Sequence, residues 1–313
     1  MNLEKSSINK GIYIIIIVIF FYAIILFLSD ANEIILVLNQ IQFERYIAIF
    51  LLAALTLFIN GWKYQIILKK ININLNFKDA FLIYTASMAM IITPGSVGMI
   101  VSNYLLKKQT KQSISKTIPV LIYDRWTDIV AITVIIGILL YWNNFIVSEI
   151  IFGIGLVLSG FMFFVFKNSA GLNLLNNILL KTRILKKMVI NTEEFQDSAK
   201  KLTSSKTIIS IVGISFLTKL VPMIAVYFVF DLFNLNIDFF TTSQIFLTNQ
   251  VIGVLSFIPG GIIVTETGLL GLIVQNGTNF TIATMIVLLL RVVTFWFPMI
   301  IGFIVLKFVL AKR

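Results

Sequence analysis

Cysteine and histidine are both absent from this sequence of 313 residues, and charged residues make up only 12% of it. Without cysteine the chain forms no disulfides and no thiolate metal sites. Without histidine it lacks the commonest metal ligand and the most frequent general base of enzymes. Apolar residues make up 58% of the chain and its mean hydropathy is +0.98, which leaves too little polar surface for a soluble domain. We therefore expect an integral membrane protein.

The net charge of +11 comes from 25 basic and 14 acidic residues. A basic balance is typical of nucleic-acid-binding proteins, but also of membrane proteins, whose cytoplasmic loops are rich in Lys and Arg. The basic residues form no cluster outside such loops, so we expect no nucleic-acid partner. Their positions instead assign the two sides of the membrane.

Six segments are apolar over about the 20 residues that a membrane-spanning helix needs. They are residues 12–29, 45–66, 117–141, 146–166, 207–230 and 281–306. The first follows Lys5 and Lys10 and runs into Ser29-Asp30-Ala31, a pattern that loosely resembles a cleaved signal peptide. Because the apolar run is long for a signal and more spans follow, we favour a retained first helix.

Two further apolar stretches are interrupted by proline and glycine. Residues 79–106 are broken at Pro94-Gly95, and residues 240–276 at Pro259-Gly260-Gly261. Basic segments flank the first stretch on both sides, whereas acidic or uncharged segments flank the second. Each stretch thus begins and ends on one side of the membrane, as a re-entrant hairpin does. Arm length favours hairpins, but charge alone leaves open the alternative of full crossings, with eight spans.

The order span, span, hairpin, span occurs twice, in residues 12–141 and 146–306, with opposite orientation. Such an inverted-topology repeat is common in secondary transporters. The spacing agrees, because Pro94 precedes Arg125 by 31 residues and Pro259 precedes Arg291 by 32. The sequence therefore predicts an all-α polytopic fold of six spans and two hairpins.

This topology implies a single transmembrane domain over residues 1–313, in the cell (inner) membrane, with both termini cytoplasmic. Residues 167–206 lie outside the repeat and contain eight basic and three acidic residues. Since residues 172–188 mix Leu and Ile with Lys and Arg, we expect a cytoplasmic segment with helices at the membrane surface.

Several charged side chains lie within the predicted spans, where an unpaired charge costs several kcal/mol. At a rise of about 1.5 Å per residue, Arg125, Lys219 and Arg291 lie about 12 to 18 Å along their helices, near the middle of the membrane. Asp124 and Asp128 accompany Arg125, and a spacing of three residues allows Arg125 and Asp128 to pair.

Glu266 follows the second break and could pair with Arg291 or Lys219. Such pairs either form a transport site or only lock helices together, and the sequence leaves both interpretations open. Lys63 lies near a cytoplasmic helix end, so we expect its side chain to extend to the membrane interface.

Both hairpin tips are expected to reach the middle of the membrane, where a half-helix begins after each break. Its free N–H groups and positive dipole end favour an anion. Thr93, Ser96, Thr265 and Thr267 add hydroxyl donors, so a phosphate fits the site and a bare cation does not. The predicted substrate-binding residues are Arg125, Arg291, Glu266, Asp128, Asp124, Lys219, Pro94, Gly95, Pro259, Gly260, Gly261 and Thr265.

The residues around both breaks resemble a known family. Thr93-Pro94-Gly95-Ser96-Val97-Gly98, Asp124-Arg125-Trp126-Thr127-Asp128, Pro259-Gly260-Gly261-Ile262-Ile263-Val264-Thr265-Glu266 and Arg291 are similar to the transmembrane region of the lysylphosphatidylglycerol synthase family and to its stand-alone flippase-like members. The resemblance covers about residues 50–305. It implies translocation of a charged lipid or a lipid-linked sugar between leaflets.

The sequence departs from the family pattern at several positions. The first hairpin of such proteins usually continues with Gly-Glu and a basic residue, whereas Met99 and Ser102 occupy those positions here, and Ile263 replaces a usual glycine. The two hairpins are therefore not equivalent, which shifts the expected site toward Glu266, Arg291 and Arg125. The aminoacyl-transfer domain of full-length synthases does not follow in these residues, so we do not expect lysyl-lipid synthesis.

The leading hypothesis is a flippase for an anionic phospholipid or a lipid-linked (polyprenyl-phosphate) sugar, with the headgroup held between the hairpin tips. The alternatives are a secondary transporter of a small anion, a membrane-embedded enzyme acting on a lipid phosphate, and a scaffold for membrane glycosyltransferases. We expect no enzymatic activity, metal or cofactor, because histidine and cysteine are absent and buried carboxylates are few.

Overall fold

The computed structural model describes residues 43–93, 101–142, 146–168, 192–256 and 258–311, with a few residues between 23 and 35 and between 170 and 173. Within these ranges the chain forms helices and no β-strand. The predicted first span, residues 12–29, lies almost entirely outside the described residues. The tip of the first hairpin, with Pro94 and Gly95, also lies outside them.

Four helical stretches of the described chain are long and apolar enough to cross a membrane. They are α3 (Phe43–Lys70), α7 (Ile146–Lys167), α10 (Ser205–Leu232) and the continuous stretch Phe280–Ala311, and they coincide with four predicted spans. A fifth predicted span corresponds to α6 (Ile114–Leu139), which is 26 residues long but carries charged residues in its middle. The chain is thus a multi-pass helical membrane protein.

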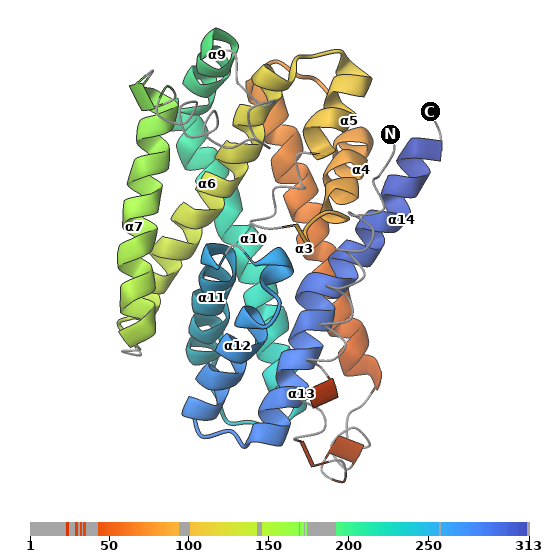
Figure 1. Cartoon of the computed structure of the whole chain (residues 1–313), viewed down its shortest axis with the longest axis vertical. Helices are drawn as coiled ribbons and strands as arrows, with labels where there is room; N and C mark the ends of the chain where they lie inside the picture. The colour runs from red at the N-terminus through yellow and green to blue at the C-terminus, as the bar shows by residue number, and fades with distance from the viewer. Residues whose placement is uncertain are drawn as a thin grey trace.

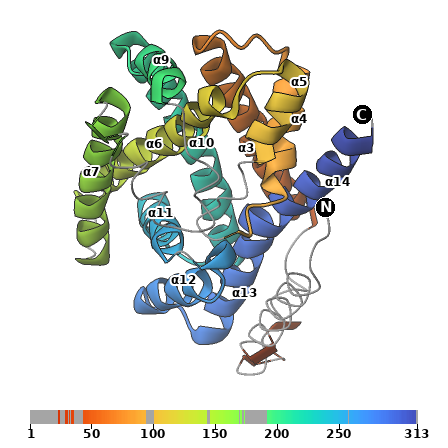
Figure 2. The ribbon, with the colours of Figure 1, turned by 45° about the horizontal axis from the view of Figure 1, so that its top comes forward.

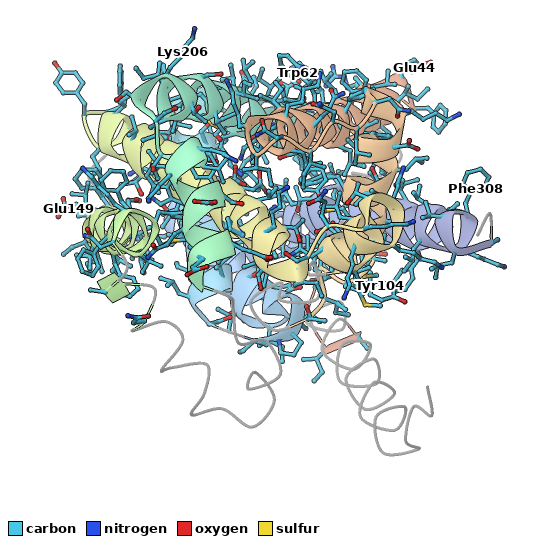
Figure 3. The ribbon with its side chains drawn as sticks, turned by 90° about the horizontal axis from the view of Figure 1, so that it is seen from above. Glu44, Trp62, Tyr104, Glu149, Lys206 and Phe308 are labelled. Atoms are coloured by element: carbon cyan, nitrogen blue, oxygen red, sulfur yellow. The ribbon has the colours of Figure 1, made fainter. Side chains whose placement is uncertain are left out.

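Large apolar side chains project from the outside of this bundle. Figure 3 shows Trp62, Tyr104 and Phe308 at the periphery of the molecule, and all three are exposed. A soluble protein rarely exposes so much apolar surface, whereas a surface that faces lipid does so without cost. The exterior therefore agrees with membrane embedding.

The second broken stretch forms a helical hairpin. Its arms, α11 (Phe239–Leu255) and α12 (Val264–Gln275), pack against each other and are joined through a short 3₁₀ turn, η3 (Pro259–Gly261). Figure 1 shows both arms extending from the lower end of the molecule toward its middle. With 17 and 12 residues, each arm is shorter than the about 20 residues of a full crossing.

The first broken stretch provides two short helices at the opposite end of the molecule, as Figures 1 and 2 show. These are α4 (Phe77–Met88) and α5 (Val101–Thr110), which pack against each other. They contain 12 and 10 residues, so each is shorter than the about 20 residues of a full crossing.

Polar side chains cap the first arm of each hairpin. Asn76 accepts a hydrogen bond of 2.8 Å from the amide of Asp79 before α4, and Asp238 accepts bonds of 2.8 and 3.0 Å from the amides of Phe240 and Thr241 before α11. Partial burial acts to raise the pKa of Asp238, but these bonds and one from the Thr241 hydroxyl hold that pKa below its usual range. The caps fix where both hairpins begin.

Each hairpin also packs against the last helix of the other half of the chain. α4 lies along α14 (Phe297–Ala311), where Gly302 brings the two backbones together: a Cβ at this position would lie 2.4 Å from the amide nitrogen of Ala89. Conversely, α11 of the second half packs against α6, the last helix of the first hairpin's half. In addition, α3 of the first half packs side by side with α10 of the second half. The two halves are therefore interlocked.

The basic segment 167–206 contributes one described helix, α9 (Thr192–Leu202), beside α6 and α7. Phe195, Ala199 and Leu202 bury one face of α9 in the bundle, while the basic residues of its last turn are exposed. An amphipathic helix of this kind covers the end of the bundle that lies at the top of Figure 1.

Candidate functional site

Five charged side chains from three helices meet inside the bundle, and we call them the five-charge cluster. Lys63 comes from α3, Asp124, Arg125 and Asp128 come from α6, and Lys219 comes from α10. Three are basic and two are acidic, so the cluster has one formal positive charge in excess. Buried charges need close partners of opposite sign, and the geometry of the cluster provides them.

Lys63 is fully buried at the centre of this cluster. Its Nζ lies 2.9 Å from the carboxylate of Asp124 and 2.7 Å from that of Asp128, and it donates a hydrogen bond of 3.2 Å to the carbonyl of Asp124. The prediction that Lys63 reaches the membrane interface is therefore wrong. α3 extends to Lys70, beyond the predicted end at residue 66, so Lys63 lies almost two turns inside the helix.

The other two cations share the same carboxylates. Lys219 Nζ lies 2.9 Å from Asp128 Oδ2, and Arg125 Nη2 lies 2.8 Å from Asp124 Oδ2. The predicted pair of Arg125 and Asp128 is present but longer, at 3.9 Å. The side chain of Arg125 is 38% exposed, whereas the side chains of Lys63 and Lys219 are 0% and 9% exposed. Arg125 is thus the cation of the cluster that is most open to a ligand.

A second charged pair lies at the second hairpin. Arg291 Nε donates to Glu266 Oε1 at 2.7 Å, so Arg291, not Lys219, is the partner of Glu266. Arg291 Nη2 also donates to the carbonyl of Gly260 at 2.9 Å, and the guanidinium lies 4.3 Å from the ring centre of Phe295. Arg291 therefore ties α13 (Phe280–Arg291) to the tip of the hairpin.

Arg125 and Arg291 lie at matching depths in their helices. Arg125 is eleven residues after Ile114, the first residue of α6, and Arg291 is eleven residues after Phe280, the first residue of α13. At about 1.5 Å per residue, both lie about 16 Å along their helices. This is the depth of the middle of a hydrocarbon core about 30 Å thick.

The tip of the second hairpin has an unusual backbone. Gly260 and Gly261 adopt φ values of 64° and 62°, which glycine tolerates, and a Cβ at Gly260 would lie 2.7 Å from the ring of Phe295. Ile263 adopts φ 73° and ψ −55°, a strained γ-turn conformation for a β-branched residue. This is the position where Ile263 replaces the glycine of the family pattern.

The last membrane helix widens beside this tip. After Arg291 the helix forms one π-helical turn, η4 (Val292–Trp296), before α14 begins. Pro298 lacks the N–H group that would bond to the carbonyl of Thr294, which favours the wider turn. The turn places Thr294 and Phe295 beside the hairpin, and π-turns within helices often occur at functional sites.

Two cavities adjoin these charged groups. The charge cavity, of about 140 Å³, is lined by Arg125, Asp128 and Lys219 among other residues. The hairpin cavity, of about 150 Å³, lies at the second hairpin. Its lining includes the predicted residues Gly260, Gly261, Thr265 and Arg291. Four residues line both cavities, namely Ile91, Phe246, Gln250 and Thr294.

The predicted residues thus fall into two adjoining groups. Asp124, Arg125, Asp128 and Lys219 meet in the cluster, and Glu266 and Arg291 meet at the hairpin tip. Pro94 and Gly95 lie outside the described residues, and Pro259 forms the 3₁₀ turn without lining either cavity.

Sequence reasoning missed Lys63 and the polar side chains of α11. Asn249 and Gln250 line the hairpin cavity. The sequence contains a pattern that could have indicated them, because seven of the residues 241–250 are Thr, Ser, Asn or Gln within an apolar stretch. A run of buried amides and hydroxyls in a membrane helix indicates a polar interior. In the described part of the chain, no group of three acidic residues could hold a metal ion.

Comparison with known proteins gives a matching family and similar relatives, among them two UPF0104 membrane proteins. The family is described as the lysylphosphatidylglycerol synthase TM region and matches residues 13–302. A UPF0104 membrane protein of Methanocaldococcus jannaschii is 24% identical over 215 residues, which cover 67% of this chain and 89% of that protein. A UPF0104 membrane protein of Methanothermobacter thermautotrophicus is 23% identical over 265 residues, which cover 77% and 78%.

The family match includes both hairpins and all of the buried charges described above. The expectation drawn from the sequence motifs is therefore confirmed: the chain belongs to the family of the lysylphosphatidylglycerol synthase transmembrane region.

Proposed function

We propose that this protein moves an anionic lipid, either a phospholipid or a lipid-linked sugar, between the leaflets of the cell membrane. The observation that carries the proposal is Arg125, whose side chain is 38% exposed beside a cavity at mid-membrane depth. A charged side chain at this depth costs several kcal/mol, so its presence indicates a function. Because Arg125 is also accessible, binding of a ligand is the function that we infer. The lipid phosphate binds in the charge cavity, next to Arg125 and Lys219.

The charge balance of the cluster supports an anionic ligand. Three cations share two carboxylates, so one positive charge stays uncompensated by the cluster itself. A phosphate diester carries one negative charge and accepts the paired N–H groups of a guanidinium. Its arrival neutralises the cluster, whereas a cation would add to the excess charge. The acyl or prenyl chains stay in the surrounding lipid.

Alternating access arises from two halves of opposite orientation. Support comes from the reciprocal packing of α4 on α14 and of α11 on α6, and from hairpins that enter from opposite ends. In this proposal the end with α9 and the basic loops is cytoplasmic, as are both termini. The halves rock about the cavities, and Asp128 and Glu266 exchange arginine partners as the headgroup moves.

The proposal is tested by reconstituting the purified protein in liposomes with fluorescent phospholipids or polyprenyl-phosphate sugars. Accessibility of the label to an external quencher reports movement between leaflets. We expect faster movement than in protein-free liposomes, and slower movement for Glu266→Gln and Arg291→Ala. If no lipid moves while a small anion such as inorganic phosphate enters, the protein is a small-anion transporter and the proposal is wrong.

A further inference from the structure

The hairpin cavity differs in chemistry from the charge cavity. Arg291, the one cation among the described residues of its wall, is already bound to Glu266 and to the carbonyl of Gly260. No carboxylate is among the described residues that line it. The remaining polar groups in its wall are uncharged amides and hydroxyls. The two adjoining spaces therefore favour different parts of a ligand.

Four of these uncharged groups come from three separate elements. Asn249 and Gln250 lie on α11, Thr265 lies on α12 and Thr294 lies in the π-helical turn. Within the described chain, the amide oxygens of Asn249 and Gln250 are buried without a hydrogen-bond partner. Buried acceptors without partners are costly, so the oxygen of Gln250, a residue in the wall of both cavities, favours a ligand that donates hydrogen bonds.

Hydroxyl groups and aromatic rings in the wall of the hairpin cavity also suit a ligand with several hydroxyl groups. Thr294 donates its hydroxyl proton to the carbonyl of Leu290 at 2.7 Å, so its oxygen can still accept a hydrogen bond from a ligand. Amide and hydroxyl groups both donate and accept, as the hydroxyl groups of a polyol do. Phe246 and Phe295 add apolar walls against which the C–H face of such a ligand can pack.

One ligand can reach both cavities, because they share part of their walls. Gln250 and Thr294 line both spaces, as do Ile91 and Phe246. A phosphate beside Arg125 therefore places the group attached to it next to Gln250 and the hairpin cavity.

We propose that the hairpin cavity binds an uncharged polyhydroxyl group, such as glycerol, inositol or a sugar, whose phosphate occupies the charge cavity. This inference rests on the proposed function and names its substrate class. An amine-bearing headgroup is less favoured, because it finds no carboxylate to pair with among the described residues of this cavity: Glu266 is paired with Arg291 and does not line it. We therefore expect the site to bind polyol phosphates more tightly than amine phosphates.

Binding of soluble headgroups to the purified full-length chain, measured by calorimetry, tests this selectivity without requiring transport. The probes are inositol 1-phosphate, glycerol 1-phosphate, ethanolamine phosphate and inorganic phosphate. We expect inositol 1-phosphate to bind at least about tenfold more tightly than inorganic phosphate or ethanolamine phosphate. Short-chain phosphatidylinositol shows whether the natural ligand is a lipid headgroup or a free sugar phosphate. If it binds more tightly than inositol 1-phosphate, the ligand is a lipid. If the two bind equally, the ligand is a free sugar phosphate that occupies the same site.

The variants Asn249→Ala and Gln250→Ala should each bring the affinity ratio of inositol 1-phosphate to inorganic phosphate close to one. Gln244→Ala is the matched control, because this amide lies on the same helix and lines neither cavity, and it should keep the ratio of the parent. Thermal unfolding of each variant verifies that it is folded. Equal binding of all probes by the parent, or a ratio that neither variant changes, would overturn the inference.

The two proposals fail in different ways. If the preference for inositol 1-phosphate is present but no lipid moves in the liposome assay, lipid transport is wrong and the polyol site stands. If lipids move but the parent shows no preference among headgroups, lipid transport stands and the polyol site is wrong.

Discussion

Lys63 is held in the interior by two carboxylates of α6, at a position where water does not reach it. Desolvating an ammonium group costs several kcal/mol, and contacts of 2.7 and 2.9 Å offset that cost. The same carboxylates also bind Arg125 and Lys219, so removal of one cation changes the surroundings of the others. At the scale of single residues, the cluster acts as a unit.

Replacement of Lys63 by methionine should therefore destabilise the protein by about 3 kcal/mol, because it removes the buried ammonium that contacts both Asp124 and Asp128. Thermal unfolding in detergent measures the effect. Lys78→Met is the matched control, since Lys78 is exposed, and it should change stability by less than about 0.5 kcal/mol. Equal effects of the two substitutions would contradict the pairing described for Lys63.

Substitution of Ile263 is expected to stabilise the protein instead of destabilising it. Its φ of 73° is strained for a β-branched side chain, which is itself partly exposed and has little packing to lose. Ile263→Gly should stabilise the folded protein by about 1 kcal/mol, because glycine adopts this conformation freely. The control is Ile258→Gly: Ile258 is similarly exposed at an ordinary φ of −76°, so glycine there should be destabilising. A loss of stability in both variants would contradict the strain at Ile263.

At the scale of helices and turns, the hairpins determine where the polar groups lie. The arms of the second hairpin extend toward the middle of the bundle, so η3 and the start of α12 lie next to Arg291. Close backbone packing holds the arms in place. Gly302 on α14 contacts the end of α4, where a Cβ would meet backbone atoms of Thr85, Met88 and Ala89 at 2.4 to 2.9 Å.

Gly302→Ala should consequently destabilise the protein by about 1 to 3 kcal/mol, because backbone atoms cannot move aside as a flexible side chain can. The matched control is Gly213→Ala on α10, where a Cβ would meet nothing within 4 Å. That substitution should stabilise the helix by up to about 1 kcal/mol. Thermal unfolding of both variants measures the difference, and no loss of stability in Gly302→Ala would contradict the close approach of α4 and α14.

The sequence predicted the elements of the fold better than their internal details. Apolar length identified α3, α7, α10 and the last membrane helix, and Pro259 with its two glycines located the second break. The π-helical turn after Arg291 could not be predicted, since its position depends on the packing of Phe295 against Gly260 as well as on Pro298.

At the scale of the whole molecule, the site depends on pairings between distant parts of the chain. The sequence predicted that Asp124, Arg125 and Asp128 lie together, because neighbouring turns of one helix are close. It did not place Lys63 with them, since a contact between α3 and α6 depends on tertiary packing. It also left the partner of Glu266 open between Arg291 and Lys219, and the packing of α12 against α13 selects Arg291.

The central claim, that Arg125 binds the phosphate of a transported lipid, is tested most directly by the rate of lipid movement in liposomes for two arginine variants. Arg125→Gln removes the exposed cation of the cavity, and Arg45→Gln removes a surface arginine that lies 3.5 Å from Asp231. We predict that Arg125→Gln slows movement of an anionic lipid by at least about tenfold, while Arg45→Gln stays within about twofold of the parent. Equal rates for both variants and the parent would contradict the claim.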